Sequence, residues 1–223
     1  MPRKFTPKEE EQIRNKLRAA GRELMGRRGV RKTGVEELAN AAGISKGSFY
    51  RFFSSKEELA LEILTQWERA FHAGIEQRFR SAAPKNAAEC ARQLTAVLLE
   101  DFPRQVAASG IQGLFDPQEV ACLIQQAGPE KVKLLDAQDI RLFNSLKPLF
   151  ADAGLAAGEN ELTIIAGLRI LFEAGNCVLA ESAKGSLQPE YYHTAFAKLT
   201  EGFVEKMFCP VNSKPETKDN EHE

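Results

Sequence analysis

Residues 33–58 read Thr-Gly-Val-Glu-Glu-Leu-Ala-Asn-Ala-Ala-Gly-Ile-Ser-Lys-Gly-Ser-Phe-Tyr-Arg-Phe-Phe-Ser-Ser-Lys-Glu-Glu. The apolar residues recur every three or four positions as far as Ala42, which predicts a short amphipathic helix. Gly43 follows, where a left-handed residue ends a helix at the least steric cost, and Ser45 is suited to cap a second helix over residues 45–53. Two short helices joined by a glycine turn predict a helix-turn-helix, the motif that lays its second helix in the DNA major groove.

The first of these helices has two alternative capping boxes at its start. Thr33 is followed three residues later by Glu36, and Gly34 is followed three residues later by Glu37. In either arrangement the glutamate carboxylate reaches back to the backbone N–H of the capping residue. The spacing alone leaves both arrangements open.

Helices are also predicted on both sides of the turn motif. A first helix, ending near Gly26 or Gly29, is indicated by apolar residues at helical spacing: Ile13, Leu17, Ala20 and Leu24. Ser55 and Glu58 form another capping box, which begins a long helix. We therefore expect an amino-terminal helix-turn-helix domain over residues 9–69, with the turn motif at 33–53.

The second helix of the motif has a polar outer face. Lys46, Ser48, Tyr50 and Arg51 carry groups that donate hydrogen bonds to phosphate oxygens or base edges. Gly47 has no side chain, so the backbone can approach a duplex closely. The alternative interpretation is a solvated helix face without a partner, and the turn, the caps and the local charge weigh against it.

A separate prediction concerns Lys56. It lies in the first turn of the long helix, where the helix dipole favours anions rather than cations. We interpret this lysine as a phosphate contact, in which the ammonium group and the N-terminal backbone N–H groups act together.

Charge is divided unevenly along the chain. Residues 1–56 hold 14 Lys and Arg against 6 Asp and Glu, whereas residues 57–223 hold 16 against 25. The formal net charge of −1 therefore conceals a basic amino-terminal block, which is the electrostatic footprint of nucleic-acid binding. The acidic remainder would repel DNA, so contact should be confined to the amino-terminal domain.

From Ala20 to Leu59 the sequence resembles the TetR family of bacterial transcriptional regulators. The match has no gap and runs through Leu24, Gly29, Thr33, Val35, Leu38, Ala39, Ala42, Gly43, Ile44, Ser45, Gly47, Ser48, Phe49, Tyr50, Phe53, Ser55, Lys56 and Glu57. The carboxy-terminal part is similar to the family only in its general helical layout. The resemblance implies a dimeric, cytoplasmic repressor that leaves its palindromic operator when a small molecule binds the carboxy-terminal domain.

The resemblance also implies a set of DNA-contacting residues: Thr33 at the DNA backbone, with Lys46, Gly47, Ser48, Tyr50, Arg51 and Lys56. The chain departs from the family pattern at Met25, Val30, Gly34 and Phe52. Phe52 stands where the family often has Tyr or His, so one polar phosphate contact is in doubt. Gly34 replaces a common Thr or Ser, which weakens a phosphate contact or the cap, whereas Met25 and Val30 alter core packing more than function.

The rest of the chain is also predicted to be helical, so the expected fold class is all-α, with a three-helix DNA-binding domain and a larger helical domain over residues 70–209. Prolines and glycines separate helices that we place near 56–81, 85–101, 104–113, 117–127, 129–153, 159–184 and 188–208. No run of alternating residues predicts a sheet. Residues 210–223 have almost no apolar side chains and are expected to form a disordered tail.

The last two long helices are candidates for a dimer contact. Residues 162–180 are apolar nearly all round, and residues 191–208 carry an apolar stripe. In the TetR family these helices pair across a two-fold axis as a four-helix bundle. The alternative is that both are core helices of a monomer. A helix-turn-helix protein that reads two half-sites about 34–36 Å apart favours the homodimer.

A ligand pocket is expected among the middle helices of the second domain. Such pockets are mostly apolar, with a few polar groups that orient the ligand. The candidate lining residues are Phe102, Phe115, Phe143, Leu146, Arg169, Phe172 and Asn176. Plain core packing is the alternative for each aromatic residue. Because the chain has 14 Phe but only 3 Tyr and 1 Trp, we predict a small and mostly apolar ligand.

Other functional classes receive little support from the sequence. The motifs of phosphate-binding loops, zinc proteases and serine hydrolases do not occur, so we expect no enzyme activity, cofactor or metal site. The start lacks a secretory signal, and no segment approaches eighteen uncharged apolar residues, so we expect a cytoplasmic protein without a membrane span. Two alternatives remain beside the ligand-released repressor: a constitutive DNA binder, and an all-helical carrier or enzyme.

Overall fold

The computed structural model describes residues 5–127, 129–185 and 187–211, without the side chains of residues 127–136. The fold class is all-α, as predicted, and two three-residue strands are the exception in the described chain. The expected tail lies outside the described residues from position 212 onward.

The chain forms two compact units, which are each described by themselves. Residues 1–71 and 104–138 make the first unit, and residues 72–103 and 139–223 make the second. The predicted bounds of 9–69 and 70–209 place residues 104–138 in the second domain, whereas these residues pack with the amino-terminal segment. Local patterns in the sequence could not predict this packing, because it joins segments far apart in the chain.

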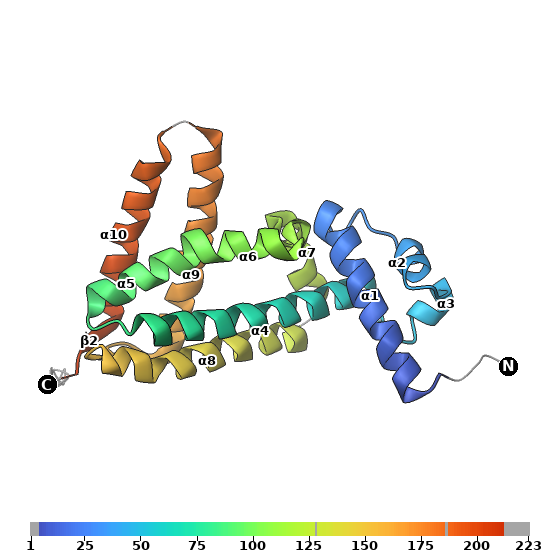
Figure 1. Cartoon of the computed structure of the whole chain (residues 1–223), viewed down its shortest axis with the longest axis horizontal. Helices are drawn as coiled ribbons and strands as arrows, with labels where there is room; N and C mark the ends of the chain where they lie inside the picture. Colours follow the sequence, from blue (N-terminus) through green and yellow to red (C-terminus); the bar gives the residue numbers. More distant parts are fainter. Residues whose placement is uncertain (1–4, 128, 186, 212–223) are drawn as a thin grey trace, which may run out of the picture. The chain divides into compact units, whose positions relative to one another are not determined.

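The first unit carries the helix-turn-helix. Its elements are α1 (Pro7–Arg28), α2 (Val35–Ala41), α3 (Lys46–Phe49), the first part of α4 (Lys56–Ala82), most of α6 (Phe102–Ser109), the 3₁₀ turn η2 (Gln112–Phe115), α7 (Pro117–Ala127) and the first part of α8 (Pro129–Asp152) (Figure 1).

Helix α1 begins with a capping box that the sequence analysis overlooked. The Thr6 hydroxyl accepts from the Glu9 N–H at 3.3 Å, and the Glu9 carboxylate accepts from the Thr6 N–H at 2.8 Å. Pro7 occupies the first turn, where its missing N–H costs nothing. The helix ends at Gly29, the later of the two predicted positions, where the backbone φ is 85°.

Of the two predicted capping boxes at α2, the structure forms the one that begins at Gly34. The Gly34 N–H donates to the Glu37 carboxylate at 2.8 Å. Thr33 is buried instead, and its hydroxyl donates to the Gly29 carbonyl at 2.8 Å. The hydroxyl of Thr33 therefore closes the loop between α1 and α2 rather than capping the helix.

One apolar core holds the first unit together. It contains Leu17 and Met25 from α1, Leu38 and Ala39 from α2, Phe49 from α3, Leu59 and Ile63 from α4, and Ile111, Leu114 and Leu123 from η2, α7 and the turn before them. The backbone of α1 comes very close to this turn, because a methyl group built on Gly26 would lie 1.9 Å from the Gly110 carbonyl oxygen. Only glycine, which has no side chain, fits at position 26 where the two backbones come this close.

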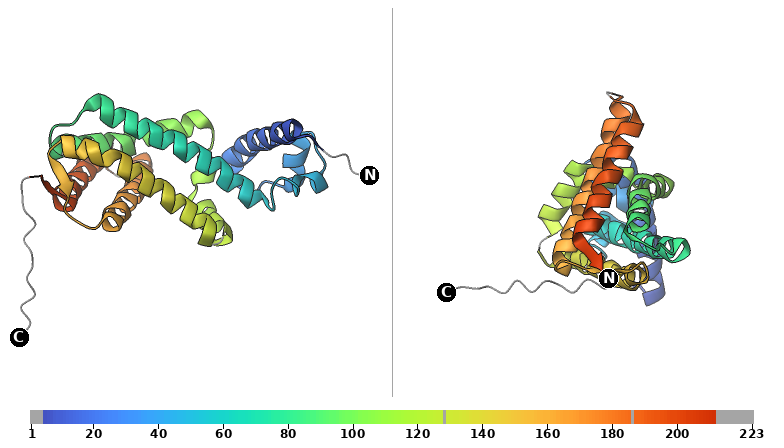
Figure 2. Two further views of the ribbon diagram at one scale, coloured as in Figure 1. Left: turned by 90° about the horizontal axis from the view of Figure 1, so that it is seen from below. Right: turned by 90° about the vertical axis from the view of Figure 1, so that its left-hand side faces the viewer.

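The second unit is built around the last two long helices. Its elements are the end of α4, α5 (Ala87–Ala96), the π-helical turn η1 (Val97–Asp101), the start of α6, the end of α8, β1 (Leu155–Ala157), α9 (Glu161–Lys184), α10 (Pro189–Met207) and β2 (Phe208–Pro210). Helix α10 packs against both α5 and α9 (Figures 1 and 2). A small apolar cluster lies between them, made by Leu98, Leu99, Leu171 and Phe196.

The two strands correct the expectation of an entirely helical chain. β1 and β2 pair antiparallel, with Leu155 opposite Pro210 and Ala157 opposite Phe208. Each strand has three residues, which is too short to show the alternating pattern by which strands are recognised in a sequence.

Helix α9 is long and apolar, although Arg169 and Glu173 interrupt its apolar residues. By length and composition alone it could cross a membrane, with a mean hydropathy of 1.6 over its most apolar window. Helices buried in a core or at a protein interface have the same composition. Its exposed side chains include Leu162 and Ile170, which are 65% and 69% exposed.

Candidate nucleic-acid interface

The turn between α2 and α3 is a tight backbone structure that fixes the direction of α3. The Ala42 N–H donates to the Leu38 and Ala39 carbonyls, and the Ile44 N–H donates to the Ala39 carbonyl at 3.0 Å. Gly43 has a φ of 73°, the left-handed conformation that glycine adopts without strain. The predicted glycine turn is therefore confirmed.

Helix α3 is anchored from beneath by aromatic rings. Phe49 and Phe53 are both buried, and their ring centroids lie 6.0 Å apart. Ser45 caps the helix, with its hydroxyl accepting from the Ser48 N–H at 3.2 Å. The regular helix is shorter than the predicted 45–53, but the Phe53 N–H still donates to the Phe49 carbonyl, so a helical turn continues to that residue.

The side chains on the outer face of α3 are open to solvent. Lys46, Tyr50 and Arg51 are exposed, as is Gly47, whereas Ser48 is half-buried. The Lys46 ammonium group makes no hydrogen bond or ion pair within the described part of the chain, so its charge is available. The Tyr50 ring is 51% exposed and meets the Phe49 ring edge-on. These five residues, Lys46, Gly47, Ser48, Tyr50 and Arg51, are called the α3 outer face below.

Arg51 and Ser48 already have contacts within the protein. The Arg51 guanidinium lies 4.9 Å from the centroid of the Phe5 ring and 3.8 Å from the Glu10 carboxylate. The Ser48 and Ser45 hydroxyl oxygens lie 2.9 Å apart. Because all of these contacts are at the surface, each is weak enough to be exchanged for a phosphate or a base edge.

Two residues that the sequence analysis assigned to DNA contact face inward. Thr33 is buried, so its hydroxyl cannot reach a phosphate in this conformation. The Lys56 ammonium group donates to the carbonyls of Val30 at 2.8 Å, Arg31 at 3.2 Å and Thr33 at 3.0 Å. An ammonium group has three donors, so the observed contacts can account for all of them.

Several arginine side chains around the core are paired with acids. Arg14 and Arg18 of α1 both contact Glu62 of α4, at 3.2 and 2.5 Å. Arg28 contacts Glu37 at 2.6 Å, and the Arg28 guanidinium holds the pKa of that carboxyl below its usual range. The Arg14 guanidinium also donates to the Phe52 carbonyl at 2.9 Å, which ties the end of the α3 turn to α1. These pairs therefore position helices, whereas Lys46 makes no ion pair or hydrogen bond with the described residues.

Phe52, one of the departures from the family pattern, packs inward. Its side chain is buried, and its ring centroid lies 6.0 Å from that of Phe5. The position therefore presents no polar group to the surface, as the sequence analysis expected.

The candidate ligand residues do not gather around one hollow of the described chain. Phe115 belongs to the first unit and meets the Trp67 ring at 4.9 Å. In the second unit the Phe102 and Phe172 rings meet edge to face at 4.5 Å. Arg169 is paired with Asp139 at 2.5 Å.

The remaining candidates lie elsewhere in the second unit. Phe143 and Leu146 are buried in α8, and Asn176 is half-buried in α9. Phe143 lines an apolar hollow of about 290 Å³, together with Phe150 and Phe208. The assignment of these seven residues to a ligand stays a prediction.

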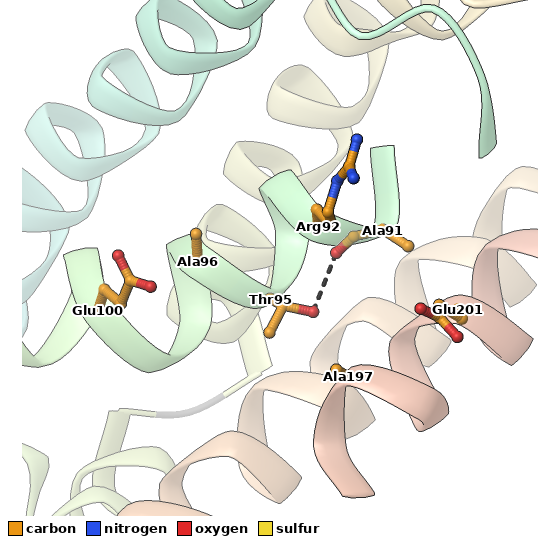
Figure 3. A pocket seen from close by; sticks show the side chains of 7 residues that line it. All are labelled: Ala91, Arg92, Thr95, Ala96, Glu100, Ala197 and Glu201. Atoms are coloured by element: carbon orange, nitrogen blue, oxygen red, sulfur yellow. Dashed lines mark hydrogen bonds between the residues drawn. The ribbon is translucent and has the colours of Figure 1, made fainter. Parts of the chain in front are cut away.

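A second, smaller hollow lies on the surface between α5 and α10. Figure 3 shows Arg92, Glu100 and Glu201 around it and small alanine side chains between them. Its volume is about 110 Å³. Its charged rim does not match the mostly apolar ligand that the composition predicts.

Taken together, the tight glycine turn, the ring-anchored short helix and its exposed polar face define a helix-turn-helix protein. Comparison with known proteins supports this class. Residues 17–63 match the family described as "Bacterial regulatory proteins, tetR family". The amino-terminal part of the chain is therefore similar to this family.

Curated relatives match the amino-terminal part. The HTH-type transcriptional repressor NemR of Escherichia coli K12 is 35% identical over 72 residues, which are 32% of this chain and 36% of NemR. The HTH-type transcriptional activator FasR of Mycolicibacterium smegmatis is 37% identical over 68 residues, which are 30% of this chain and 31% of FasR. The chain thus matches about a third of the length of these relatives.

The fold extends further than the sequence likeness. The structure of RolR in complex with resorcinol covers 92% of this chain, and the chain covers all of RolR, with a TM-score of 0.55 and 16% identity. At this identity the likeness establishes the fold alone.

Proposed function

We propose that this chain is a DNA-binding transcriptional regulator that acts in the cytoplasm as a homodimer. The observation that carries the proposal is the α3 outer face, where Lys46 has no partner among the described residues and Tyr50 is half exposed. The basic amino-terminal block supplies the attraction to phosphate that non-specific binding needs. Lys46 and Ser48 are the proposed base readers, and Tyr50 and Arg51 the proposed phosphate contacts.

The homodimer is proposed from the exposed apolar residues of α9 and α10. Leu162 and Ile170 on α9, and Tyr191 and Leu199 on α10, are each more than half exposed. α9 and α10 pack against each other within the second unit, so these residues belong to one pair of helices. Two such pairs related by a two-fold axis would bury these side chains in a four-helix bundle.

The proposed mode of regulation is repression, released by a small and mostly apolar ligand. The repressor NemR is among the relatives of the amino-terminal part, and RolR, which shares the fold, was solved with a small phenol. The aromatic hollow lined by Phe143, Phe150 and Phe208 is a proposed place for such a ligand. A ligand releases DNA only by its differential affinity for the DNA-bound and free conformations.

A selection experiment tests this proposal. The purified chain is incubated with a library of random-sequence duplexes, and the bound fraction is amplified and sequenced. We expect a palindrome whose half-sites are about one helical turn, or a multiple of it, apart. A protein that enriches no sequence, and that ignores random duplexes at low salt, would refute the proposed function.

The ligand is tested on the selected duplex. A panel of small phenols, including resorcinol, is added to the complex while fluorescence anisotropy is recorded. Dissociation by one compound at a concentration that leaves the protein folded supports the ligand-released regulator. Unchanged binding with every compound of a broad apolar panel favours the constitutive DNA binder.

A further inference from the structure

The loop between α1 and α2, residues 29–33, is held by one carboxylate from α7. Glu119 Oε2 accepts from the backbone N–H groups of Val30 at 2.9 Å and of Arg31 at 3.1 Å. Glu119 Oε1 accepts from Arg31 Nε at 2.8 Å. Glu119 lies almost ninety residues further along the chain, yet it belongs to the same unit.

Lys56 binds the backbone carbonyl groups of the same loop. The ammonium group at the start of α4 donates to the carbonyls of Val30, Arg31 and Thr33. Val30 and Arg31 therefore have their N–H groups bound by an anion and their carbonyls bound by a cation. We call Glu119 and Lys56 the loop clamp.

The charge of Glu119 is stabilised where it lies. Burial raises the pKa of the Glu119 carboxyl, but the hydrogen bonds from the Arg31 side chain and from the backbone of Arg31 and Val30, with the Arg31 charge, outweigh burial and lower the pKa overall. The carboxylate is therefore ionised at neutral pH. An ionised buried group with its hydrogen bonds satisfied holds its partners more firmly than a neutral group would.

The loop clamp lies immediately before the DNA-binding elements. The loop is followed by Gly34, the N-cap residue of α2, and α2 leads through the Gly43 turn into α3. A shift of this loop would displace α2, and α3 would move with it because the two share the core around Leu38 and Phe49. The orientation of the α3 outer face therefore depends on how the loop is held.

We propose that Glu119 and Lys56 are positioning residues for DNA binding, which fix the α1–α2 loop and thereby the α3 outer face without touching the duplex. The proposal rests on the proposed function of the chain as a DNA-binding regulator. It replaces the role of phosphate contact that the position of Lys56 in the sequence suggested.

A positioning role and a direct effect of charge on DNA binding predict different results when Glu119 or Lys56 is replaced. Glu119 is an anion in the DNA-binding unit, so its neutralisation should strengthen binding to a polyanion if charge alone matters. If Glu119 instead positions the α1–α2 loop, its neutralisation should weaken DNA binding. For Lys56, loss of a phosphate contact lowers the slope of log Kd against log salt by about one unit, whereas loss of a positioning contact leaves this slope unchanged.

The test for Glu119 uses Glu119→Gln with Glu23→Gln as the matched control. Glu23 is exposed on α1, and its side chain makes no hydrogen bond or ion pair with the described residues, so both variants remove one negative charge from the same unit. Affinity for the selected duplex is measured by fluorescence anisotropy, with the folded fraction of each variant set by circular dichroism. We expect roughly tenfold weaker binding by Glu119→Gln, since a charge-assisted contact is lost, and unchanged or slightly tighter binding by Glu23→Gln.

The test for Lys56 uses Lys56→Met and Lys56→Arg across a range of salt concentrations. We expect Lys56→Met to weaken binding several-fold at every salt concentration with the wild-type slope. Lys56→Arg keeps donors that can reach the carbonyls and should recover most of the affinity. Hydrogen exchange at the Val30 and Arg31 amides gives a second readout, and we expect it to become faster in Glu119→Gln.

Each outcome decides between the roles. Binding by Glu119→Gln that equals or exceeds the wild type overturns the role of Glu119, and a salt slope lowered by one unit in Lys56→Met overturns that of Lys56. A Glu119→Gln protein that fails to fold also counts against the proposal, because the contact would then belong to the folding core. Failure of the wild type to select any duplex would instead refute the proposed function.

Discussion

Replacing Gly47 with alanine separates the stability of the fold from DNA binding. Gly47 lies in the first turn of α3, and its φ is outside the left-handed region. A methyl group built there would meet only the Ser45 hydroxyl oxygen, at 4.0 Å. The folded protein therefore has room for the methyl group, and the change removes conformational freedom from the unfolded chain. We expect Gly47→Ala to stabilise the protein by about 0.4–1 kcal/mol.

The expected effect of Gly47→Ala on DNA binding has the opposite sign. The backbone of α3 is expected to approach the duplex most closely at Gly47. A methyl group at this position would stand between the helix backbone and the DNA. If no room is left at that contact, overpacking costs on the order of 1–3 kcal/mol, which is roughly a 5- to 140-fold increase in Kd. We therefore predict a protein that is more stable and binds DNA more weakly.

Two measurements on the same samples check this prediction. Urea unfolding can be followed by the fluorescence of Trp67, which is the single tryptophan and lies beside Phe71 and Phe115 in the first unit. Kd for the selected duplex is measured by anisotropy. Gly43→Ala is the control, because its φ of 73° makes alanine destabilising by about 1–2 kcal/mol although the space around it is open. Unchanged Kd in Gly47→Ala would refute a close approach of the α3 backbone to DNA.

Four further changes have defined outcomes. Lys46→Ala should weaken binding to the selected duplex by about 1–3 kcal/mol and relax the sequence preference at one position of each half-site, and a repeated selection that returns the wild-type sequence would exclude base reading by Lys46. Thr33→Val removes the hydroxyl bond to Gly29 and should destabilise the protein by about 1–2 kcal/mol in urea unfolding, while the salt slope stays that of the wild type. Ile170→Glu should convert the dimer to a monomer in sedimentation, and a stable dimer would exclude this face of α9. Because the pKa of Glu119 is lowered in the folded state, its charge stabilises the protein at neutral pH, and this contribution is lost as the pH falls through that lowered pKa. Urea unfolding of Glu119→Gln should therefore lack this part of the acid dependence.

The local features of the fold could be predicted from the sequence, because their causes are local. Pro117, Pro129 and Pro189 begin helices where they were expected to, and Gly43 occupies the left-handed turn. The capping box of Thr6 and Glu9 was equally visible in the sequence and was overlooked. β1 and β2 could not be found in this way, since three-residue strands carry no periodic signal.

The inward orientation of Thr33 and Lys56 could not be predicted by local reasoning. The interpretation of Lys56 compared the ammonium group only with the dipole of its own helix. The carbonyl groups that bind it lie 23–26 residues earlier in the chain. The contact between Glu119 and the α1–α2 loop is longer in range still, at 88 and 89 residues. Such contacts depend on the packing of η2 and α7 against α1, which no periodic pattern in the sequence encodes.

The exposure of Tyr50 and Arg51 was predictable, because the helical spacing of Phe49 and Phe53 on the buried side turns these two residues away from the core. The placement of Tyr50 and Arg51 as exposed residues agrees with this reasoning. What each of them contacts in a complex stays a prediction.

Photocrosslinking from position 50 tests most directly whether the α3 outer face binds duplex DNA. Tyr50 is replaced by a benzophenone amino acid, and the complex with the selected duplex is irradiated and sequenced for adducts. We predict adducts at two places separated by about one helical turn or a multiple of it, one for each copy of the chain. If position 50 gives no more adduct than the same reagent at the exposed Glu23 position on α1, the central claim is contradicted.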